Sequence, residues 1–495
     1  MYYCLCENHK YSYEIYEILS MYFTGEKLTV CDSKSSVPEN CLLLESIVEV
    51  NGSVNAKCSL IEVKSGAFYK LGSASSSLPI EDDCKRSIKH GVKNSVFKLL
   101  RDITKIEMPW GVLVGIRPSK IVNDLKSKNK SDNEITHILK NSFFLRDDKI
   151  ELVKRISDYS YNIINRDNKT ISIYIGIPFC PTRCIYCSFA SYPIDKYTDC
   201  VENYVMALKY EITRISEFIN KHFNIETIYI GGGTPTSLPD ELFNSLLVHI
   251  NEKFDVKAVK EFTVEAGRPD TIDKIKLQIM KASYVSRISI NPQTMNEDTL
   301  IKIGRNHSVQ DIVNKFMLAR EEGFYNINMD MILGLPDETI KQVSNTLYEI
   351  TKLSPENITV HTLAIKRASK LKEDMIENVK IPIPEGPAVN SMMEYVQNFL
   401  NSKMYNPYYM YRQKMMVGNL ENVGYCKSGF EGIYNIQMIE EKETVVGLGA
   451  DAVSKLVFLH ENRIERFPNK KDIKEYINTI EENTEKKIQM LSMLT

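Results

Sequence analysis

From residue 171 onward, short apolar runs alternate with longer amphipathic stretches. The apolar runs lie at Ile171–Ile177, Thr227–Ile230, Phe262–Val264, Arg287–Ile290, Ile327–Leu333 and Ile358–Leu363. The amphipathic stretches between them lie at Val201–Phe223, Asp240–Phe254, Ile272–Ala282, Val309–Glu322 and Thr339–Leu353. Strands that alternate with helices predict βαβ units and a parallel sheet. Such a series would form a partial (β/α)6 barrel, although an open, doubly wound sheet produces the same alternation.

The segments before and after this region have a different pattern. A strand and a helix are expected over residues 1–23, and we expect further strands at Lys27–Cys31, Cys41–Val50 and Cys58–Val63 and helical stretches at Cys84–Thr104 and Ser131–Asn165. After residue 380 come a Pro-rich turn, a helix at Ala388–Ser402, a Tyr-rich segment and a Gly-rich segment. We therefore expect an α/β fold in three parts: an N-terminal α/β domain over 1–165, the barrel over 166–380, and a C-terminal extension over 381–495 that covers the substrate.

Composition narrows the possible partners and compartment. The formal net charge of −2 gives no reason to expect nucleic acid as a partner. We see no apolar run long enough to span a bilayer, and residues 1–10 lack the basic-then-apolar order of a secretory signal. We therefore expect a cytoplasmic protein without a membrane span. Most of its 11 cysteines should then be reduced and buried as small apolar residues.

Three cysteines differ from the rest because they share one short loop directly after the first strand of the barrel. Cys180, Cys184 and Cys187 can ligate three irons of a [4Fe-4S] cluster and leave the fourth iron open. An open iron can chelate the amino and carboxylate groups of a methionine, and such clusters reach low reduction potentials. The alternative is zinc, which usually needs a second Cys/His pair, and none lies nearby. The motif thus predicts a cluster that binds and cleaves S-adenosylmethionine (SAM).

The sequence from Tyr174 through the three cysteines to Phe189 resembles the radical SAM family of oxygen-independent coproporphyrinogen III oxidases, and within it the HemZ-type coproporphyrinogen dehydrogenases. The resemblance covers about residues 165–460. It implies an oxidoreductase that removes hydrogen from the β-carbon of a porphyrinogen propionate, after which CO2 and one electron leave and a vinyl group remains. The implied product is protoporphyrinogen IX, in porphyrin and haem biosynthesis. The implied electron donor is a low-potential flavodoxin or ferredoxin.

Polar motifs follow the predicted strands at the ends where barrel enzymes carry their active sites. Taken alone, the Gly231–Gly233 triplet is a plain turn, Glu265 a solvated charge and Asp330 a structural ion pair. The family resemblance instead implies that a set of residues along these strands contacts SAM. The set is Tyr174, Tyr186, Gly232, Gly233, Thr234, Glu265, Gln293, Arg305, Asp330, Ala364 and Val453, with His307 as a supporting hydrogen-bonding residue.

The substrate contacts are less specific in the sequence. Tyr408–Lys414, with Lys366 and Arg367, offers the aromatic and cationic groups that an anionic tetrapyrrole needs, or else a tyrosine core with a solvated basic edge. Two positions depart from the oxidases, which have a His in place of Gly176 and a Cys in place of Phe189. The Cys-X-Phe pattern is that of related haem chaperones. A haem-binding protein and a radical SAM enzyme with another substrate therefore stand beside the oxidase.

Overall fold

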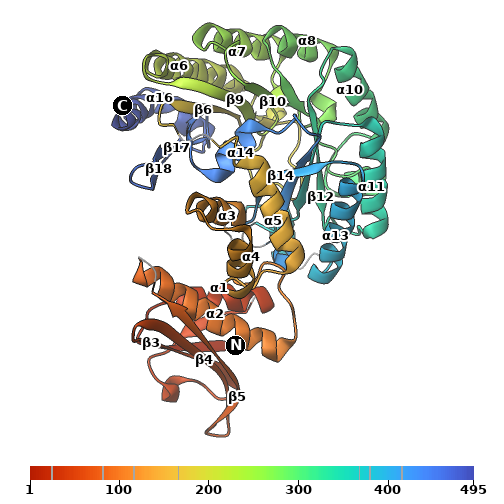
Figure 1. Ribbon diagram of the computed structural model, residues 1–495. Coiled ribbons are helices and arrows are strands. Elements are labelled where there is room, and N and C mark those ends of the chain that lie inside the picture. Colours follow the sequence, from red (N-terminus) through yellow and green to blue (C-terminus); the bar gives the residue numbers. More distant parts are fainter. Residues whose placement is uncertain are drawn as a thin grey trace. The chain divides into compact units, whose positions relative to one another are not determined.

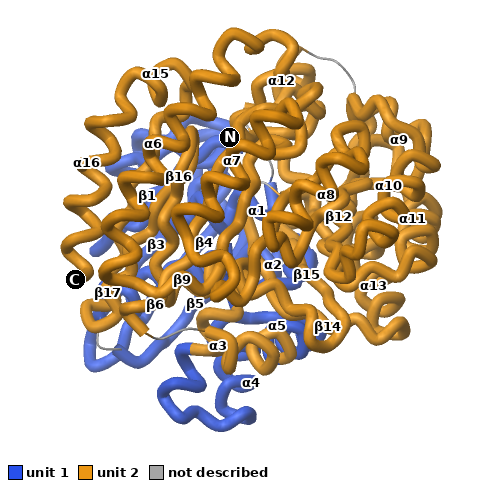
Figure 2. The backbone as a smooth tube through the Cα atoms, turned by 90° about the horizontal axis from the view of Figure 1, so that it is seen from above, with its two compact units in different colours: residues 1–118, 124–154 blue, residues 119–123, 155–495 orange. Residues whose placement is uncertain are grey.

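A computed structural model of the chain (Figure 1) describes residues 1–23, 26–80, 83–114, 117–164, 167–366, 368–377, 381–413 and 416–495. The chain divides into two compact units, residues 1–118 with 124–154 and residues 119–123 with 155–495 (Figure 2). The expected boundaries at residues 165 and 380 stay predictions. No helix within the described ranges is long and apolar enough to cross a membrane.

The first unit contains a five-stranded sheet with the order β2-β1-β3-β4-β5. Its strands are β1 (Tyr2–Glu7), β2 (Leu28–Val30), β3 (Cys41–Val50), β4 (Ser53–Lys64) and β5 (Ala67–Pro79). The helices of this part of the chain are α1 (Ser12–Tyr22), α2 (Cys84–Thr104), α3 (Pro118–Ser127), α4 (Asp132–Asn141) and α5 (Asp147–Ser160). The predicted strands and helices are confirmed, except that the stretch expected at Ser131–Asn165 is two helices. β5 was not predicted because most of its side chains are exposed and show no apolar alternation.

The second unit contains an eleven-stranded sheet with six parallel strands in chain order at its centre. These strands are β6 (Thr170–Ile177), β9 (Asn224–Gly232), β10 (Glu261–Glu265), β11 (Arg287–Ser289), β12 (Ile327–Leu333) and β13 (Asn357–Thr362). The helices between them are α6 (Thr198–His222), α7 (Asp240–Lys253), α8 (Lys274–Ala282), α9 (Glu297–Lys302), α10 (Val309–Glu321) and α11 (Ile340–Leu353). Figure 1 shows α6, α7, α8, α10 and α11 following one another around the outside of the sheet. This arrangement confirms the expected partial (β/α)6 barrel over the open, doubly wound sheet that the alternation left as an alternative.

Residues after 380 extend this sheet at both ends. β15 (Asn422–Cys426) pairs antiparallel with β13 and with β14 (Asn406–Tyr411), while β16 (Thr444–Leu448) pairs parallel with β6. The remaining elements are β17 (Val453–Phe458), β18 (Arg463–Pro468), α12 (Lys370–Ile376), α13 (Gly386–Ser402), α14 (Ile433–Glu440), α15 (Ile473–Asn478) and α16 (Ile480–Leu491). Among the described strands β14 and β18 are the two edges, so the barrel stays open.

Candidate active site

A cavity of about 340 Å³ lies at the C-terminal ends of the parallel strands. This is the position of the active site in barrel enzymes, because loops from successive strands converge there. Most of the residues expected to bind the cluster or SAM line it: Cys180, Cys184, Cys187, Tyr186, Gly232, Gly233, Thr234, Glu265, Gln293, Arg305, Asp330 and Ala364. The structure therefore brings residues from widely separated strands and loops to one space.

Two expected SAM contacts are not among the lining residues. The Tyr174 ring lies inside the barrel and stacks on those of Tyr229 and Tyr434, with centroids 6.2 Å and 6.4 Å apart. Val453 begins β17 and pairs with Pro468 in β18. Contacts of these two residues with SAM stay predictions. His307 also lies outside the lining, and its ring nitrogens have no hydrogen-bond partner among the described residues.

The three cysteines belong to residues 180–191, here called the cluster loop. Cys180 and Cys184 are buried and Cys187 is partly buried. The loop is tied on both sides by backbone hydrogen bonds, from the N–H of Ile185 to the Ile303 carbonyl at 3.2 Å and from the N–H of Leu371 to the Ile185 carbonyl at 2.8 Å. These two bonds attach the loop to segments far along the chain and so help to position the cysteines.

The arrangement of the thiols fits a cluster and does not fit a single metal ion. Among the residues that the structure describes, no three His, Cys, Asp or Glu side chains converge closely enough to hold one ion. The thiolates of a four-iron cluster each bind a different iron, so they surround a larger space. Burial raises the pKa of Cys187 to about 11 and raises that of Cys180 as well. These thiols therefore keep their protons until iron binds, and assembly of the cluster releases protons.

The glycines after β9 let the cluster loop approach the sheet. Gly233 donates its N–H to the Ile177 carbonyl, and Thr234 donates its own to the Phe179 carbonyl, both at 2.7 Å. A Cβ atom at Gly233 would lie 2.5 Å from the Phe179 oxygen and 3.0 Å from the Cys180 sulfur. A side chain at this position would therefore displace Cys180, so only glycine allows this close approach of the loop to the sheet.

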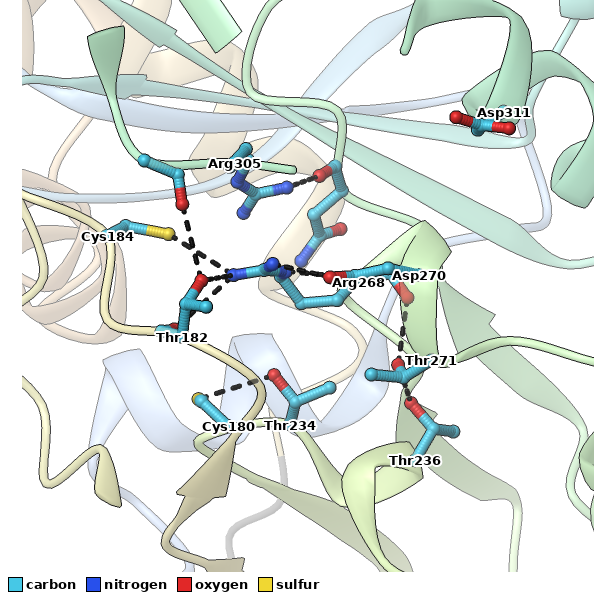
Figure 3. Close-up of polar contacts among 12 residues, drawn as sticks. Cys180, Thr182, Cys184, Thr234, Thr236, Arg268, Asp270, Thr271, Arg305 and Asp311 are labelled. Carbon is cyan, nitrogen blue, oxygen red and sulfur yellow. Dashed lines mark hydrogen bonds and ion pairs between the residues drawn. The ribbon is translucent and has the colours of Figure 1, made fainter. Parts of the chain in front are cut away.

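Arg268 connects the cluster loop to β10 (Figure 3). Its guanidinium donates to the Thr182 hydroxyl at 3.0 Å and to the Cys184 sulfur at 3.8 Å, and it forms an ion pair with Asp270 at 2.6 Å. Arg268 thus links two residues of the cluster loop to the segment after β10. The sequence contained this arginine in the motif after Glu265, but its partner could not be recognised without the fold.

Several buried polar atoms on the cavity wall lack a partner among the described residues. They are the side-chain oxygens of Asn291 and Gln293 and the Nε of Arg305. Gln293 also has a positive φ of 67°, which is uncommon for a residue with a side chain. Buried polar groups normally have partners, so these atoms point to a polar ligand that offers both donors and acceptors. The amino and carboxylate groups of SAM have this chemistry.

Two carboxyl groups in the cavity have different environments. Burial raises the pKa of Glu265 to about 7, and the charge of Asp330 adds to the rise, although the Tyr229 hydroxyl donates to Glu265 at 2.5 Å. Burial alone would also raise the pKa of Asp330, but the nearby His361 and the Asn328 amide together lower it. One carboxyl therefore titrates near neutral pH while the other stays ionised.

The segment expected to contact the substrate, Tyr408–Lys414, lies partly in the core and partly in the cavity wall. Tyr408 is fully buried and accepts a hydrogen bond from Arg287 at 3.3 Å, as a core tyrosine would. Tyr411 and Gln413 line the cavity, and so does Lys366, whose ammonium lies 5.5 Å from the centre of the Phe189 ring. Arg367 and Lys414 lie outside the described residues. The interpretation as a core stripe thus holds for Tyr408, whereas Tyr411 faces the cavity.

Sequence reasoning missed several lining residues, among them Arg268, Asn291, His361 and Asn422. Asn291 and His361 lie near the C-terminal ends of strands β11 and β13. Their position at these strand ends could have identified them as site residues from the sequence. Asn422 is in β15, a strand that was not expected, and it accepts a hydrogen bond from the Thr362 N–H at 2.7 Å. The register of strands decides which of these polar residues point into the cavity.

Comparisons with known proteins agree with this site. A model of the Radical SAM superfamily matches residues 174–349. The chain is 40% identical to the oxygen-independent coproporphyrinogen-III oxidase-like protein HemZ of Bacillus subtilis, over 84% of this chain and 83% of that protein. It is 32% identical to the haem chaperone HemW of Bacillus subtilis, over 57% of this chain and 70% of that protein.

Among solved structures, coproporphyrinogen III oxidase (HemN) from Escherichia coli superimposes with a TM-score of 0.52 at 22% identity, over 65% of this chain and 72% of that one. This likeness concerns the fold. The alignment to HemZ, by contrast, covers more than four fifths of both chains. The chain therefore belongs to the radical SAM superfamily, in the family of coproporphyrinogen III oxidase-like proteins that includes HemZ, and its cofactors are a [4Fe-4S] cluster and SAM.

Proposed function

We propose that the chain is a coproporphyrinogen III dehydrogenase that converts two propionate groups to vinyl groups and yields protoporphyrinogen IX. The observation that carries this proposal is a single cavity lined by three cluster thiols, by unpartnered polar atoms that fit SAM, and by a lysine suited to a carboxylate. The identity to an oxidase-like relative over most of both chains supports the same function.

The cluster and SAM, when bound, supply a 5′-deoxyadenosyl radical that removes one hydrogen atom from a propionate β-carbon. Loss of CO2 and transfer of one electron to a one-electron carrier, such as an oxidised flavodoxin or ferredoxin, would then leave a vinyl group. The protein holds the reacting carbon in place and keeps water out, which dominates the rate of such a step. Ile332 and Leu363 form an apolar part of the cavity wall, and the Lys366 ammonium offers a cation to a propionate.

The segment after residue 380 contributes to this cavity. Tyr411, Gln413 and Asn422 form part of its wall. This supports the proposed role of the C-terminal extension in covering the substrate. A low-potential flavodoxin or ferredoxin would reduce the cluster; loss of activity when that protein is withheld and no chemical reductant is present would support such a partner.

The decisive experiment is product analysis under anaerobic conditions. Purified protein with a reconstituted cluster is incubated with SAM, a reductant and coproporphyrinogen III, and the products are oxidised to porphyrins and separated. We expect protoporphyrin, with two molecules of 5′-deoxyadenosine and two of CO2 for each. Formation of 5′-deoxyadenosine with unchanged coproporphyrinogen would refute the proposed substrate and leave a radical SAM enzyme that acts on another molecule.

A second candidate, a haem-binding protein that delivers haem, is favoured by the surroundings of Phe189 and Gly176. Phe189 is 62% exposed at the cavity, where an exposed aromatic ring can stack on a macrocycle. A Cβ atom at Gly176 would lie 3.1 Å from the Ala450 carbonyl oxygen, so a histidine there would require a small shift of the turn after β16. Stoichiometric haem binding without turnover would support this candidate, and a titration without any change in the haem spectrum would exclude it.

A further inference from the structure

His361 is the one histidine that lines the cavity within the described ranges. It lies in β13, and its side chain is 26% exposed. Its Nε2 is 3.6 Å from an Asp330 carboxylate oxygen, and its Nδ1 is 3.3 Å from the Tyr411 hydroxyl. Both ring nitrogens thus have a polar neighbour from another strand of the sheet, from β12, which pairs with β13, and from β14, which lies beyond β15 on the other side.

The tyrosine determines which nitrogen of His361 carries the proton. Burial raises the pKa of Tyr411, and the charges of Asp330 and Glu265 add to the rise, so the phenol keeps its proton. When this hydroxyl donates to Nδ1, the N–H of the imidazole ring lies on Nε2, toward Asp330. A hydrogen bond to one ring nitrogen fixes the tautomer and the orientation of the whole imidazole ring, as in metal-binding histidines.

Asp330 is held on its other side as well. Asn328 donates its side-chain N–H to the second carboxylate oxygen at 2.7 Å. The titratable groups around this carboxylate are His361, Glu265 on β10, Tyr229 on β9, and Tyr409 and Tyr411 on β14. Of these, His361 favours the ionised form of Asp330, whereas Glu265 would disfavour it once ionised.

We propose that His361 is a positioning residue that, together with Tyr411, holds the Asp330 carboxylate in a fixed orientation toward the polar groups of bound SAM. The inference rests on the proposed SAM contact of Asp330. Asn328 donates to one carboxylate oxygen of Asp330, and the His361 ring lies 3.6 Å from the other, so the carboxylate presents its remaining lone pairs in defined directions. An oriented acceptor binds a hydroxyl better than a mobile one. Sequence reasoning assigned no role to His361.

The test measures equilibrium binding of SAM to the cluster-loaded protein at pH 6, 7 and 8.5, with 5′-deoxyadenosine formation as a second readout. For His361→Leu we expect the Kd for SAM to rise about tenfold at pH 8.5, the usual effect of losing one hydrogen bond to a charged group. The ratio should grow toward pH 6, because burial then raises the pKa of Asp330 without opposition from His361. The exposed His460→Leu is the matched control and should bind SAM like the wild type.

Two conservative variants keep the test decisive if His361→Leu does not fold. In His361→Gln the amide nitrogen can take the place of Nε2 and donate to Asp330, so binding should remain within about threefold of the wild type. In His361→Asn the amide is too short to reach Asp330, and binding should weaken as in the leucine variant. Equal SAM affinities for the two variants, or a leucine variant with the wild-type affinity at every pH, would overturn the inference. A wild-type protein that never cleaves SAM would instead refute the proposed function.

Discussion

Replacing Glu265 with glutamine tests whether this buried carboxylate destabilises the cofactor-free protein and contributes to the binding of SAM. The Glu265 carboxyl is part of the cavity wall and accepts a hydrogen bond from Tyr229. Glutamine keeps the shape and an acceptor oxygen for Tyr229, but it cannot ionise. The substitution therefore removes the charge and little else.

The size of the effect follows from the pKa of Glu265. In the fold, burial raises this pKa from 4.5 to about 7, which corresponds to about 3 kcal/mol. A carboxyl whose pKa is higher in the folded protein than in the unfolded chain stabilises the fold below the unfolded value. This contribution is lost as the pH rises through the folded value. The cofactor-free wild type should thus lose about 3 kcal/mol between pH 4.5 and pH 7 on account of this residue, relative to Glu265→Gln.

The assay is urea unfolding of the cofactor-free wild type and Glu265→Gln across this pH range. We expect the variant to approach the wild type in stability near pH 4.5 and to be more stable by about 3 kcal/mol at pH 8. The variant should also bind SAM more weakly at pH 8, because it has lost a carboxylate expected to contact the ligand. A stability difference that does not change with pH would refute the assignment of a raised pKa to Glu265.

Three further substitutions probe the rest of the site. Cys187→Ala should bind less iron and form no 5′-deoxyadenosine, which metal analysis and product chromatography can measure; full activity would contradict the ligand assignment. Gly233→Val places a side chain against the Phe179 carbonyl, so displacement of the cluster loop should lower 5′-deoxyadenosine formation about 100-fold. Lys366→Gln should raise the KM for coproporphyrinogen III about tenfold and leave the Kd for SAM unchanged; a change in SAM affinity alone would place the lysine at a different ligand.

The central barrel could be predicted because its strands are covered on both faces. Such strands form continuous apolar runs, and β12 coincides with the predicted run at Ile327–Leu333. The helices between them begin at clear signals: Ser308 and Thr339 both form capping boxes at the starts of α10 and α11. The cluster cysteines were recognised for a similar reason, since their spacing within one loop needs no knowledge of distant segments.

Contacts that depend on strand register could not be predicted. His361 was visible as a polar residue in an apolar strand, but its neighbours Asp330 and Tyr411 lie 31 and 50 residues away along the chain. Arg268 likewise contacts Cys184 across 84 residues. Hydrophobic periodicity shows which face of a strand is buried, whereas the pairing of strands determines which polar groups meet.

The place of Gly176 shows how an unpredicted strand changes the chemistry of a predicted site. β16 pairs with β6 as a further parallel strand, and the turn after it packs against the end of β6. The Tyr204 hydroxyl donates to the Gly176 carbonyl at 2.6 Å and accepts from the Ala450 N–H at 3.0 Å, which fixes this approach. A Cβ atom at Gly449 would lie 2.4 Å from the Gly176 oxygen, and Gly449 has a positive φ of 90°, so the end of β16 needs glycine. The oxidases' histidine has no counterpart on β6 in this chain, and the histidine that faces the cavity comes instead from β13, on the other side of the parallel sheet.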